Sequence, residues 1–457
     1  MLRQLHIENF KAWEDSGEIR LAPLTIFCGN NSSGKSSIAQ FLLMLKQTVE
    51  SYDRKRVLHL GDKDSKIDLG TYRDIVHRNE TDRKLRFKFE YDAFPPLKIT
   101  DATIGPKDLR QFSRIAFEAE VAFDEKRSLT VNELQYTLKN GKSVDFRLVS
   151  GDGNKYDLTA DGYTLRRQQG RGWKLPPPEN FFGFPDEAVA YYQNTGFLPD
   201  LSLSIKNLFR SMYYVGPLRD HPERFYQFSG DAPADVGDKG KLAVNALLAA
   251  KEAGRKISPG ERKRYVDFEH WIAQWLQQMR LIHSFRVVPI AKDRKEYEVR
   301  IRVNQNSPEV LITDVGFGIS QILPVIVQCF YVPSNSILFF EQPEIHLHPS
   351  VQSHLGDLFI DAIKVKEGGK SRNTQIIVES HSEHLIRRIQ RRVAEGKISP
   401  EDVAIYFIHQ DRNGAKMESL NIDLFGNVTN WPENFFGDEL EDLMAMTEAA
   451  RKKAQEK

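Results

Sequence analysis

The chain carries at positions 29 to 36 the sequence Gly29-Asn30-Asn31-Ser32-Ser33-Gly34-Lys35-Ser36, which has the form G-x-x-x-x-G-K-S of a phosphate-binding loop. One apolar run, Leu24 to Cys28, precedes it and another, Ile38 to Leu43, follows it, which predicts strand, loop and helix in that order. The glycines allow a tight turn whose N–H groups face a β-phosphate, while the lysine reaches the β and γ oxygens and the serine hydroxyl meets Mg²⁺. A chance Gly- and Ser-rich turn is the alternative, but motif and flanks agree. We therefore predict a nucleoside triphosphate site that includes Asn30, Asn31, Ser32, Ser33, Gly34, Lys35, Ser36 and Ser37, with Ser36 as a metal ligand.

Composition and charge narrow the class of protein only a little. The 457 residues are 40% hydrophobic and 28% charged, as in ordinary globular proteins, and the net charge of +1 gives no global attraction to nucleic acid or membrane. Cys28 and Cys329 are too few for a disulfide framework or a zinc cluster, and their apolar neighbours predict buried thiols. The N-terminus lacks a signal-peptide core and no apolar run approaches the length of a membrane span. We expect a cytoplasmic protein.

Changes in periodicity divide the chain into segments. Apolar and charged residues alternate in Arg86 to Tyr91 and in Ala116 to Phe123, which predicts an antiparallel β region. From Ser336 onward, apolar strands alternate with helical stretches, which predicts buried parallel strands, and a hairpin is expected around the turn Arg412-Asn413-Gly414. We expect these parts: an N-terminal lobe with the phosphate loop at 1–75, an inserted β-rich and helical region at 76–210, a helical and strand connection at 211–310, a C-terminal lobe at 311–412, and a C-terminal hairpin and charged tail at 413–457.

The C-terminal third carries three further motifs. Four apolar residues, Ile337 to Phe340, place Glu341 at the end of a predicted strand, where a carboxylate can hold Mg²⁺ against the phosphates. Upstream, Asp314-Val315-Gly316-Phe317-Gly318-Ile319-Ser320-Gln321 is a Gly-rich turn that opens an apolar helix. Downstream, His381 follows another predicted strand. Taken alone, a Gly-x-Gly turn is more often structural, and a histidine after a strand is usually a surface or core residue.

The order of these motifs resembles the head domain of the ABC/SMC/RecF superfamily. The resemblance implies an α/β fold, an ABC-type P-loop ATPase head with an inserted antiparallel β region and a helical segment. In that superfamily two heads dimerise with ATP between them, the phosphate loop of one facing the signature turn of the other. It implies that ATP and Mg²⁺ are the cofactors, that the chain forms a homo-oligomer, and that Gly316, Gly318 and Ser320 are the signature, Glu341 the magnesium ligand and His381 the switch histidine.

More narrowly, the chain resembles prokaryotic AAA-type ATPases related to the OLD group. The phrases that carry this likeness are Asp314 to Gln321, Glu341-Gln342-Pro343-Glu344-Ile345-His346-Leu347-His348-Pro349 and His381-Ser382-Glu383-His384. The stretches Tyr214 to Asp220 with Arg224, and Asn421-Ile422-Asp423 with Trp431 to Phe436, resemble one subgroup, which includes the ATPase subunit of the Septu anti-phage defence system and retron-associated ATPases. The resemblance implies that Arg219 and Arg224 approach the nucleotide or the dimer interface; surface charges beside a turn are the alternative.

Two departures from the family pattern bear on function. ABC-type heads place a catalytic glutamate directly after the magnesium carboxylate, and here that residue is Gln342, whose amide cannot act as a general base. Either Glu344 substitutes, or hydrolysis is slow and bound ATP holds the heads together, so Gln342, Glu344 and His381 are the candidate catalytic residues. OLD-type nucleases also carry a metal site with an Asp-x-Asp pair, which is missing after His381. A separate nuclease effector, of HNH or TOPRIM type, is therefore expected as a partner.

Three classes of function remain open from the sequence. The first is an ATPase that regulates a partner nuclease in anti-phage defence. The second is a RecF/SMC-like DNA-binding ATPase in DNA repair, for which the basic run Arg387 to Arg392 offers a possible phosphate-binding face, although a solvated helix explains it equally well. The third is an ATP-gated scaffold without significant turnover, for which Gln342 is the argument. A transporter motor is disfavoured by the long β-rich interval between the phosphate loop and the signature.

Overall fold

The computed structural model describes residues 1–63, 65–100, 109–124, 128–170, 174–258, 264–292, 294–412, 414–432 and 439–455. A six-stranded sheet forms its centre, with the strand order β10-β17-β20-β4-β21-β22. The strands are β10 (Met212–Val215), β17 (Ile337–Glu341), β20 (Gln375–Glu379), β4 (Leu24–Gly29), β21 (Val403–Asp411) and β22 (Gly414–Leu420). The first five run parallel and β22 returns antiparallel. The sheet therefore brings strands from both ends of the chain side by side.

Alternate residues of the central strands enter two separate cores, one on each face. Phe27 and Phe339 join a core with the antiparallel β region, whereas Leu24, Ile26 and Phe340 join a core of helices. Because successive side chains of a strand point to opposite faces, a strand buried on both faces must be apolar throughout. This explains the continuous apolar runs of the sequence.

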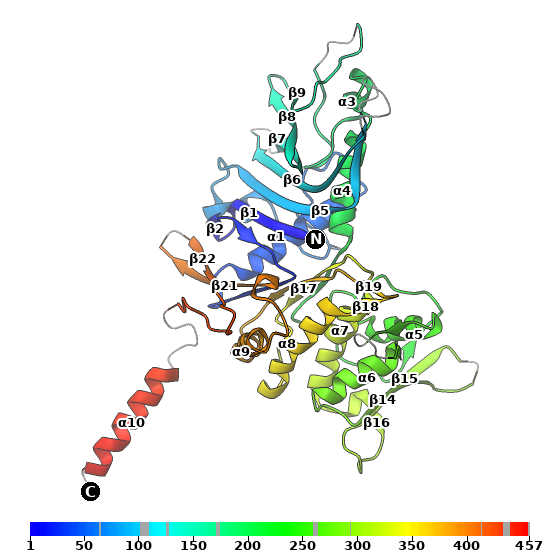
Figure 1. Ribbon diagram of the computed structural model, residues 1–457, viewed down its shortest axis with the longest axis vertical. Coiled ribbons are helices and arrows are strands. Elements are labelled where there is room, and N and C mark those ends of the chain that lie inside the picture. The colour runs from blue at the N-terminus through cyan, green and yellow to red at the C-terminus, as the bar shows by residue number, and fades with distance from the viewer. Residues whose placement is uncertain are drawn as a thin grey trace.

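An antiparallel sheet with the path β2-β1-β5-β6-β7-β8-β9 forms the lobe at the top of Figure 1. Its strands are β1 (Leu2–Phe10), β2 (Trp13–Asp15), β5 (Leu85–Thr100), β6 (Leu109–Phe123), β7 (Leu129–Asn140), β8 (Lys142–Gly151) and β9 (Lys155–Asp161), and β3 (Ile19–Arg20) pairs with β1. The expected antiparallel region is confirmed, and its sheet crosses the expected boundary at residue 75 because β1 pairs with β5, with Leu5 opposite Phe89. The division into segments itself stays a prediction.

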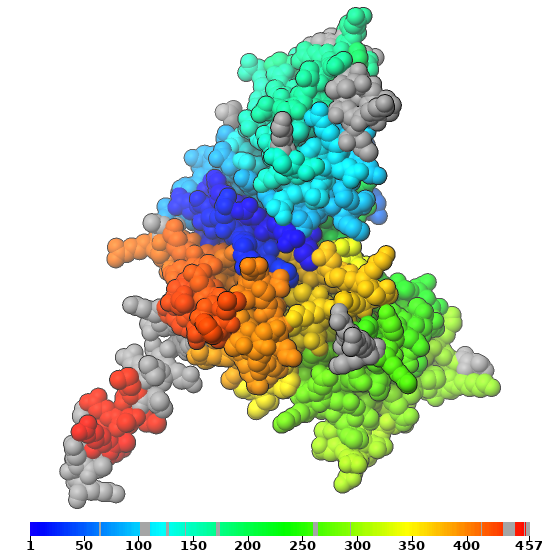
Figure 2. Space-filling model, in the orientation of Figure 1, coloured from blue at the N-terminus to red at the C-terminus, as the bar shows by residue number. Residues whose placement is uncertain are grey.

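Helices cover both faces of the central sheet. On the side of the β lobe lie α1 (Lys35–Glu50) and α4 (Leu198–Arg210), and on the other side α7 (Phe317–Tyr331), α8 (Pro349–Lys364) and α9 (Glu383–Ala394). In Figure 2 the N-terminal segment, in blue, lies between the β lobe above and the C-terminal third, in orange, below. The phosphate loop connects β4 of the central sheet to α1, which packs on the side of the β lobe.

The remaining elements surround this frame. A smaller sheet of β11 (Tyr226–Gln227), β15 (Glu296–Arg302), β14 (Ser284–Pro289) and β16 (Val310–Leu311) packs with α5 (Ala243–Glu252) and α6 (Phe268–Gln278). The short elements are α2 (Tyr72–Ile75), α3 (Asp186–Tyr191), the two-residue strands β12 (Lys256–Ile257), β13 (Val266–Asp267), β18 (Lys366–Glu367) and β19 (Lys370–Ser371), and the 3₁₀ turns η1 (His77–Asn79), η2 (Ile312–Asp314) and η3 (Pro400–Asp402). Figure 1 draws α10 (Glu439–Gln455) away from the body.

The predicted hairpin is present as β21 and β22, whereas Asn413 of its turn and residues 433–436 of the Trp431 to Phe436 stretch lie outside the described residues. Both cysteines are free and buried, as expected. In the described part of the chain no helix combines the length and apolar character that crossing a bilayer requires.

Candidate functional site

The phosphate loop connects β4 to α1 as the sequence predicts. Gly34 is the N-cap of α1 with a φ of 104°, and Gly29 has a φ of 137°, both in the region that favours glycine. A Cβ on Gly29 would lie 1.9 Å from the carbonyl oxygen of Ile408 on the adjacent strand β21. The loop is further held by hydrogen bonds from the Trp13 indole to the Gly34 carbonyl (3.1 Å) and from the Gln410 amide to the Ser32 carbonyl (2.7 Å). Tertiary contacts therefore hold the loop in its turn.

Gly29→Ala is expected to lower the free energy of unfolding by at least about 2 kcal/mol, because strain at positive φ adds to a forced separation of β4 from β21. Gly17 is the matched control, since its φ of 62° is also positive but a Cβ there meets nothing within 4 Å. Gly17→Ala should cost about 1 kcal/mol. Urea unfolding of both proteins measures the difference, and equal costs would contradict the close approach at Gly29.

Lys35 is 4% exposed, and its Nζ donates to the carbonyl oxygens of Asn30 (2.6 Å) and Gly29 (3.1 Å). Burial lowers the pKa of Lys35, and the nearby Glu379 carboxylate opposes that shift. The ammonium group is therefore held within the loop in which the phosphates are expected, surrounded by carbonyl oxygens that a phosphate would replace as partners.

Two carboxylates lie side by side at the carboxyl ends of β17 and β20, where Glu341 and Glu379 are register partners. The Tyr214 hydroxyl donates to Glu341 Oε2 (2.5 Å), and the Ser36 hydroxyl donates to Glu379 Oε1 (2.8 Å). Ser36 and Glu341, the predicted metal ligands, supply the oxygen donors that Mg²⁺ prefers. In the described residues no three His, Cys, Asp or Glu side chains are placed to bind a metal together, so a cation here would need the Ser36 hydroxyl and the nucleotide phosphates as well.

Glu379 is a site residue that the sequence analysis missed. It is 2% exposed, and burial followed by the Glu341 charge raises the pKa of Glu379 to about 7. The signal that could have found it is the one that identified Glu341: a carboxylate directly after an apolar run, here Ile376 to Val378.

The candidate catalytic residues surround the same strand ends. Glu344 is buried, its Oε1 accepts from the backbone N–H of His381 (2.6 Å), and burial raises the pKa of its carboxyl group. Gln342 is half-buried with a φ of 44°, and its N–H donates to the Glu379 carbonyl (2.8 Å). His381 is exposed at the surface of the site. Desolvation by the surrounding protein and the Lys35 charge lower the pKa of its imidazole. The structure thus brings Gln342, Glu344 and His381 together with the phosphate loop.

The predicted signature turn opens α7, with Gly316 as its N-cap. Gly316 is exposed and Gly318 half-buried, whereas Ser320 is 7% exposed and its hydroxyl donates to the Phe317 carbonyl of its own helix (2.7 Å). Phe317 lies between His221 and His346, with ring centroids 5.1 and 5.3 Å away. The surface of this turn therefore consists of two glycines and an aromatic ring, and the serine side chain faces inward.

Arg219 and Arg224 have different environments. Arg219 is 6% exposed and donates to backbone carbonyls of α7 and of the turn after β17, including that of Gln342 (3.1 Å); burial lowers the pKa of Arg219 to about 10. It therefore ties these two segments together, and it is neither a surface charge nor part of an exposed interface in this structure. Arg224 is exposed and pairs with Asp314 (3.4 Å), two residues before Gly316.

The basic run of α9 is neutralised within the chain. Arg388 and Arg392 both pair with Asp357 of α8, at 3.3 and 2.6 Å, while Arg387 pairs with Glu383 and Arg391 with Glu395. These partners offset the positive charge that a phosphate-binding face needs.

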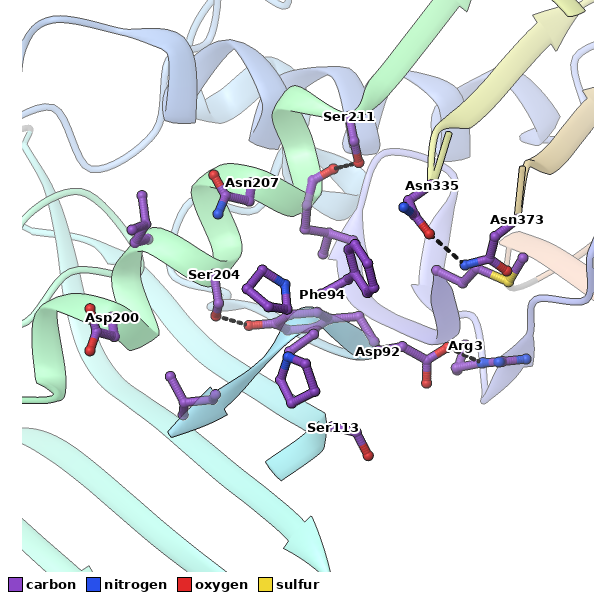
Figure 3. A pocket seen from close by; sticks show the side chains of 18 of the residues that line it. Arg3, Asp92, Phe94, Ser113, Asp200, Ser204, Asn207, Ser211, Asn335 and Asn373 are labelled. Atoms are coloured by element: carbon purple, nitrogen blue, oxygen red, sulfur yellow. Dashed lines mark hydrogen bonds and ion pairs between the residues drawn. The ribbon is translucent and has the colours of Figure 1, made fainter. Parts of the chain in front are cut away.

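A cavity of about 850 Å³ opens at the opposite edge of the central sheet (Figure 3). Its lining residues Ser211, Asn335 and Asn373 lie just before β10, β17 and β20, at the amino ends of these parallel strands. Ligands of open parallel sheets bind beyond the carboxyl ends. The residues that line this cavity include none of the predicted site residues, so we assign it no part in nucleotide binding.

Comparison with known families agrees with this geometry. The sequence profile of the family described as AAA ATPase domain matches residues 1–156 and 250–386, which include the phosphate loop, the signature turn, Glu341 and His381. The chain belongs to the AAA ATPase domain family. As a member of that family it is a nucleotide-binding protein of the P-loop ATPase type, and the predicted α/β fold with an inserted antiparallel β region is confirmed.

The other comparisons are less specific than the match to the AAA ATPase domain. Residues 398–446 match a family described as protein of unknown function (DUF3696), and no curated protein matches the chain. Solved structures that resemble it include an SMC head bound to the C-winged helix domain of ScpA (12% identity, TM-score 0.42, covering 93% of this chain and 98% of that one). Another is the SMC head domain from Thermotoga maritima (10% identity, TM-score 0.40, 92% and 98% covered). The family assignment rests on the sequence profile.

Proposed function

We propose that this AAA ATPase binds ATP with Mg²⁺, hydrolyses it slowly, and assembles through ATP-sandwiched heads to regulate a separate nuclease in anti-phage defence. The observation that carries the proposal is Gln342 at the position of the catalytic base. Its backbone is hydrogen bonded to β20 between the two strand ends, and the nearest alternative base, Glu344, is buried and bonded to the His381 N–H. An amide orients water but does not accept its proton, so bound ATP persists.

Assembly is proposed to place the signature turn of one protomer against the nucleotide of another. Among the described residues no side chain caps the exposed N-terminus of α7, and helix N-termini bind phosphate oxygens. Its glycines leave room for a close approach, because a Cβ on Gly316 would meet nothing within 4 Å. Exposed Phe317 adds apolar surface at the same place.

Gly318→Leu is expected to block ATP-dependent association while leaving ATP binding by each protomer intact. A Cβ at this position lies 3.6 Å or more from its neighbours, so the side chain fits the isolated head but obstructs the opposing phosphates' approach. We expect association to weaken at least ~30-fold, as for an interface contact of about 2 kcal/mol. Analytical ultracentrifugation with and without ATP measures it.

Gly196→Leu is the matched control, because it adds the same side chain where a Cβ meets nothing within 4 Å. Ser320→Ala is expected to weaken association less, since the Ser320 hydroxyl is bonded within its own helix. Association that persists unchanged in both the Gly318→Leu and Ser320→Ala proteins would refute the sandwich.

The role in defence and the nuclease partner are proposed from the resemblance of the motifs and from the missing Asp-x-Asp pair. The test is reconstitution with the product of the adjacent gene. Cleavage of plasmid DNA by the purified pair should be low with ATP bound and should rise when ATP is removed. Equal cleavage with and without ATP would contradict the regulatory role. An adjacent recombination gene would favour the alternative function in DNA repair. The ion pairs of the α9 arginines argue against direct DNA contact by that helix. The proposed location is the cytoplasm, where ATP is abundant.

A further inference from the structure

The environment of Glu379 differs from that of an ordinary buried acid. Its Oε1 accepts from Ser36, whereas its Oε2 is buried and has no hydrogen-bond partner among the described residues. An unpaired carboxylate oxygen shielded from water destabilises the fold unless a positive group compensates it. The buried oxygen therefore points to a missing partner.

The surrounding charges show what kind of partner is missing. Glu341 is the register neighbour of Glu379, and Glu344 also contributes negative charge to its surroundings. Lys35 is the cation that faces Glu379, and its Nζ is engaged by the loop carbonyls of Gly29 and Asn30, whereas Arg219 faces Glu344. A divalent cation beside Ser36 would compensate this excess of negative charge.

The hydrogen bond between Ser36 and Glu379 sets the direction of the serine lone pairs. Because the hydroxyl hydrogen points to Glu379 Oε1, the oxygen lone pairs are left for a cation on the other side. Partners of this kind orient a metal's own ligands and increase their affinity for it. Tyr214 orients Glu341 in the same way, because its hydroxyl donates to Glu341 Oε2.

We propose that Glu379 is a positioning residue for the divalent cation of Mg·ATP, because it orients Ser36 and adds negative charge beside the cation that Ser36 and Glu341 hold. This inference rests on the proposed nucleotide function and names one further residue of that site. Its consequence is that the chain discriminates strongly between Mg·ATP and cation-free ATP. With the cation, Glu379 stabilises the bound state; without it, Glu379 repels the phosphates.

The test is equilibrium binding of AMPPNP, a non-hydrolysable ATP analogue, to Glu379→Gln with Mg²⁺ and with EDTA. Glutamine has the same shape and can still accept from Ser36, so the fold is retained. We expect the affinity for Mg·AMPPNP to fall ~10-fold or more, as for partners of metal ligands, and the Mg²⁺ concentration for half-saturation to rise. The affinity for AMPPNP in EDTA should increase, because a negative charge beside the phosphates is removed.

Opposite changes with and without the cation distinguish positioning from a structural role, which would lower both affinities together. Glu90→Gln is the matched control, a buried glutamate of the β lobe that pairs with Lys139, and it should change neither affinity. Ser36→Ala combined with Glu379→Gln should lose less than the product of the single losses.

Equal changes in both conditions, or an unchanged affinity for Mg·AMPPNP, would overturn the inference while leaving the proposed function standing. Failure of the wild-type protein to bind Mg·AMPPNP would instead refute the proposed function.

Discussion

Lys35→Ala is expected to lower the affinity for ATP at least ~10²-fold, which removes binding at ordinary concentrations, because the β and γ oxygens lose a desolvated cation. The fold should survive, since the Lys35 Nζ contacts carbonyl oxygens of its own loop and α1 is anchored by its apolar face. Fluorescent-nucleotide titration measures the affinity, and circular dichroism checks the fold.

Lys46→Ala is the control for this prediction. Lys46 is a buried lysine of the same helix, but its Nζ pairs with Glu50 (2.6 Å) and the Phe209 carbonyl, remote from the loop. Its loss should reduce stability and leave nucleotide affinity unchanged. A folded Lys35→Ala protein with wild-type affinity would remove the basis for nucleotide binding at this loop.

Gln342→Glu is expected to raise ATP turnover ~10²-fold, the usual effect of a positioned general base, and to shorten the lifetime of the ATP-bound assembly. The substitution is nearly isosteric and keeps the same backbone strain at positive φ, so the change isolates the ability to accept a proton. Release of phosphate by the purified protein, without partner or DNA, provides the measurement.

Glu344→Gln separates the two explanations for catalysis. If Glu344 is the base, this variant loses ~10²-fold in turnover; under the proposal made here, the already low rate stays low, because the amide still accepts from the His381 N–H. Rapid multiple-turnover hydrolysis by the wild-type protein would contradict the proposed persistence of bound ATP.

Much of the site could be predicted because its signals are local. The phosphate loop, Glu341 and His381 each occupy a strand end that is visible as an apolar run followed by a polar residue, and the spacing of a motif does not depend on the rest of the fold. The antiparallel alternation of β5 and β6 is equally local. The order of these motifs is enough to suggest a P-loop ATPase, and the sequence profile shows the family.

Other features depend on which segments become neighbours. The hydrogen bond between Ser36 and Glu379 joins residues 343 positions apart, and it exists only because β20 pairs with β4. In the same way, β1 joins the sheet of β5, and Arg219 reaches the turn after β17 from a segment far upstream. Sequence periodicity reports which face of an element is buried, but not which element covers it.

The residues 24–50 specify, without reference to the remainder of the chain, a strand, a glycine turn and a helix that together can hold phosphates, because backbone geometry and apolar spacing are properties of neighbouring residues. The tertiary structure decides which side chains from other parts of the chain lie next to that loop. Parallel pairing places Glu379 rather than Gln342 beside Ser36, and the helical turn of α7 directs Ser320 inward while it exposes Gly316. The physical reason is that side-chain direction at a strand end or helix start follows from register and packing, which long-range contacts determine.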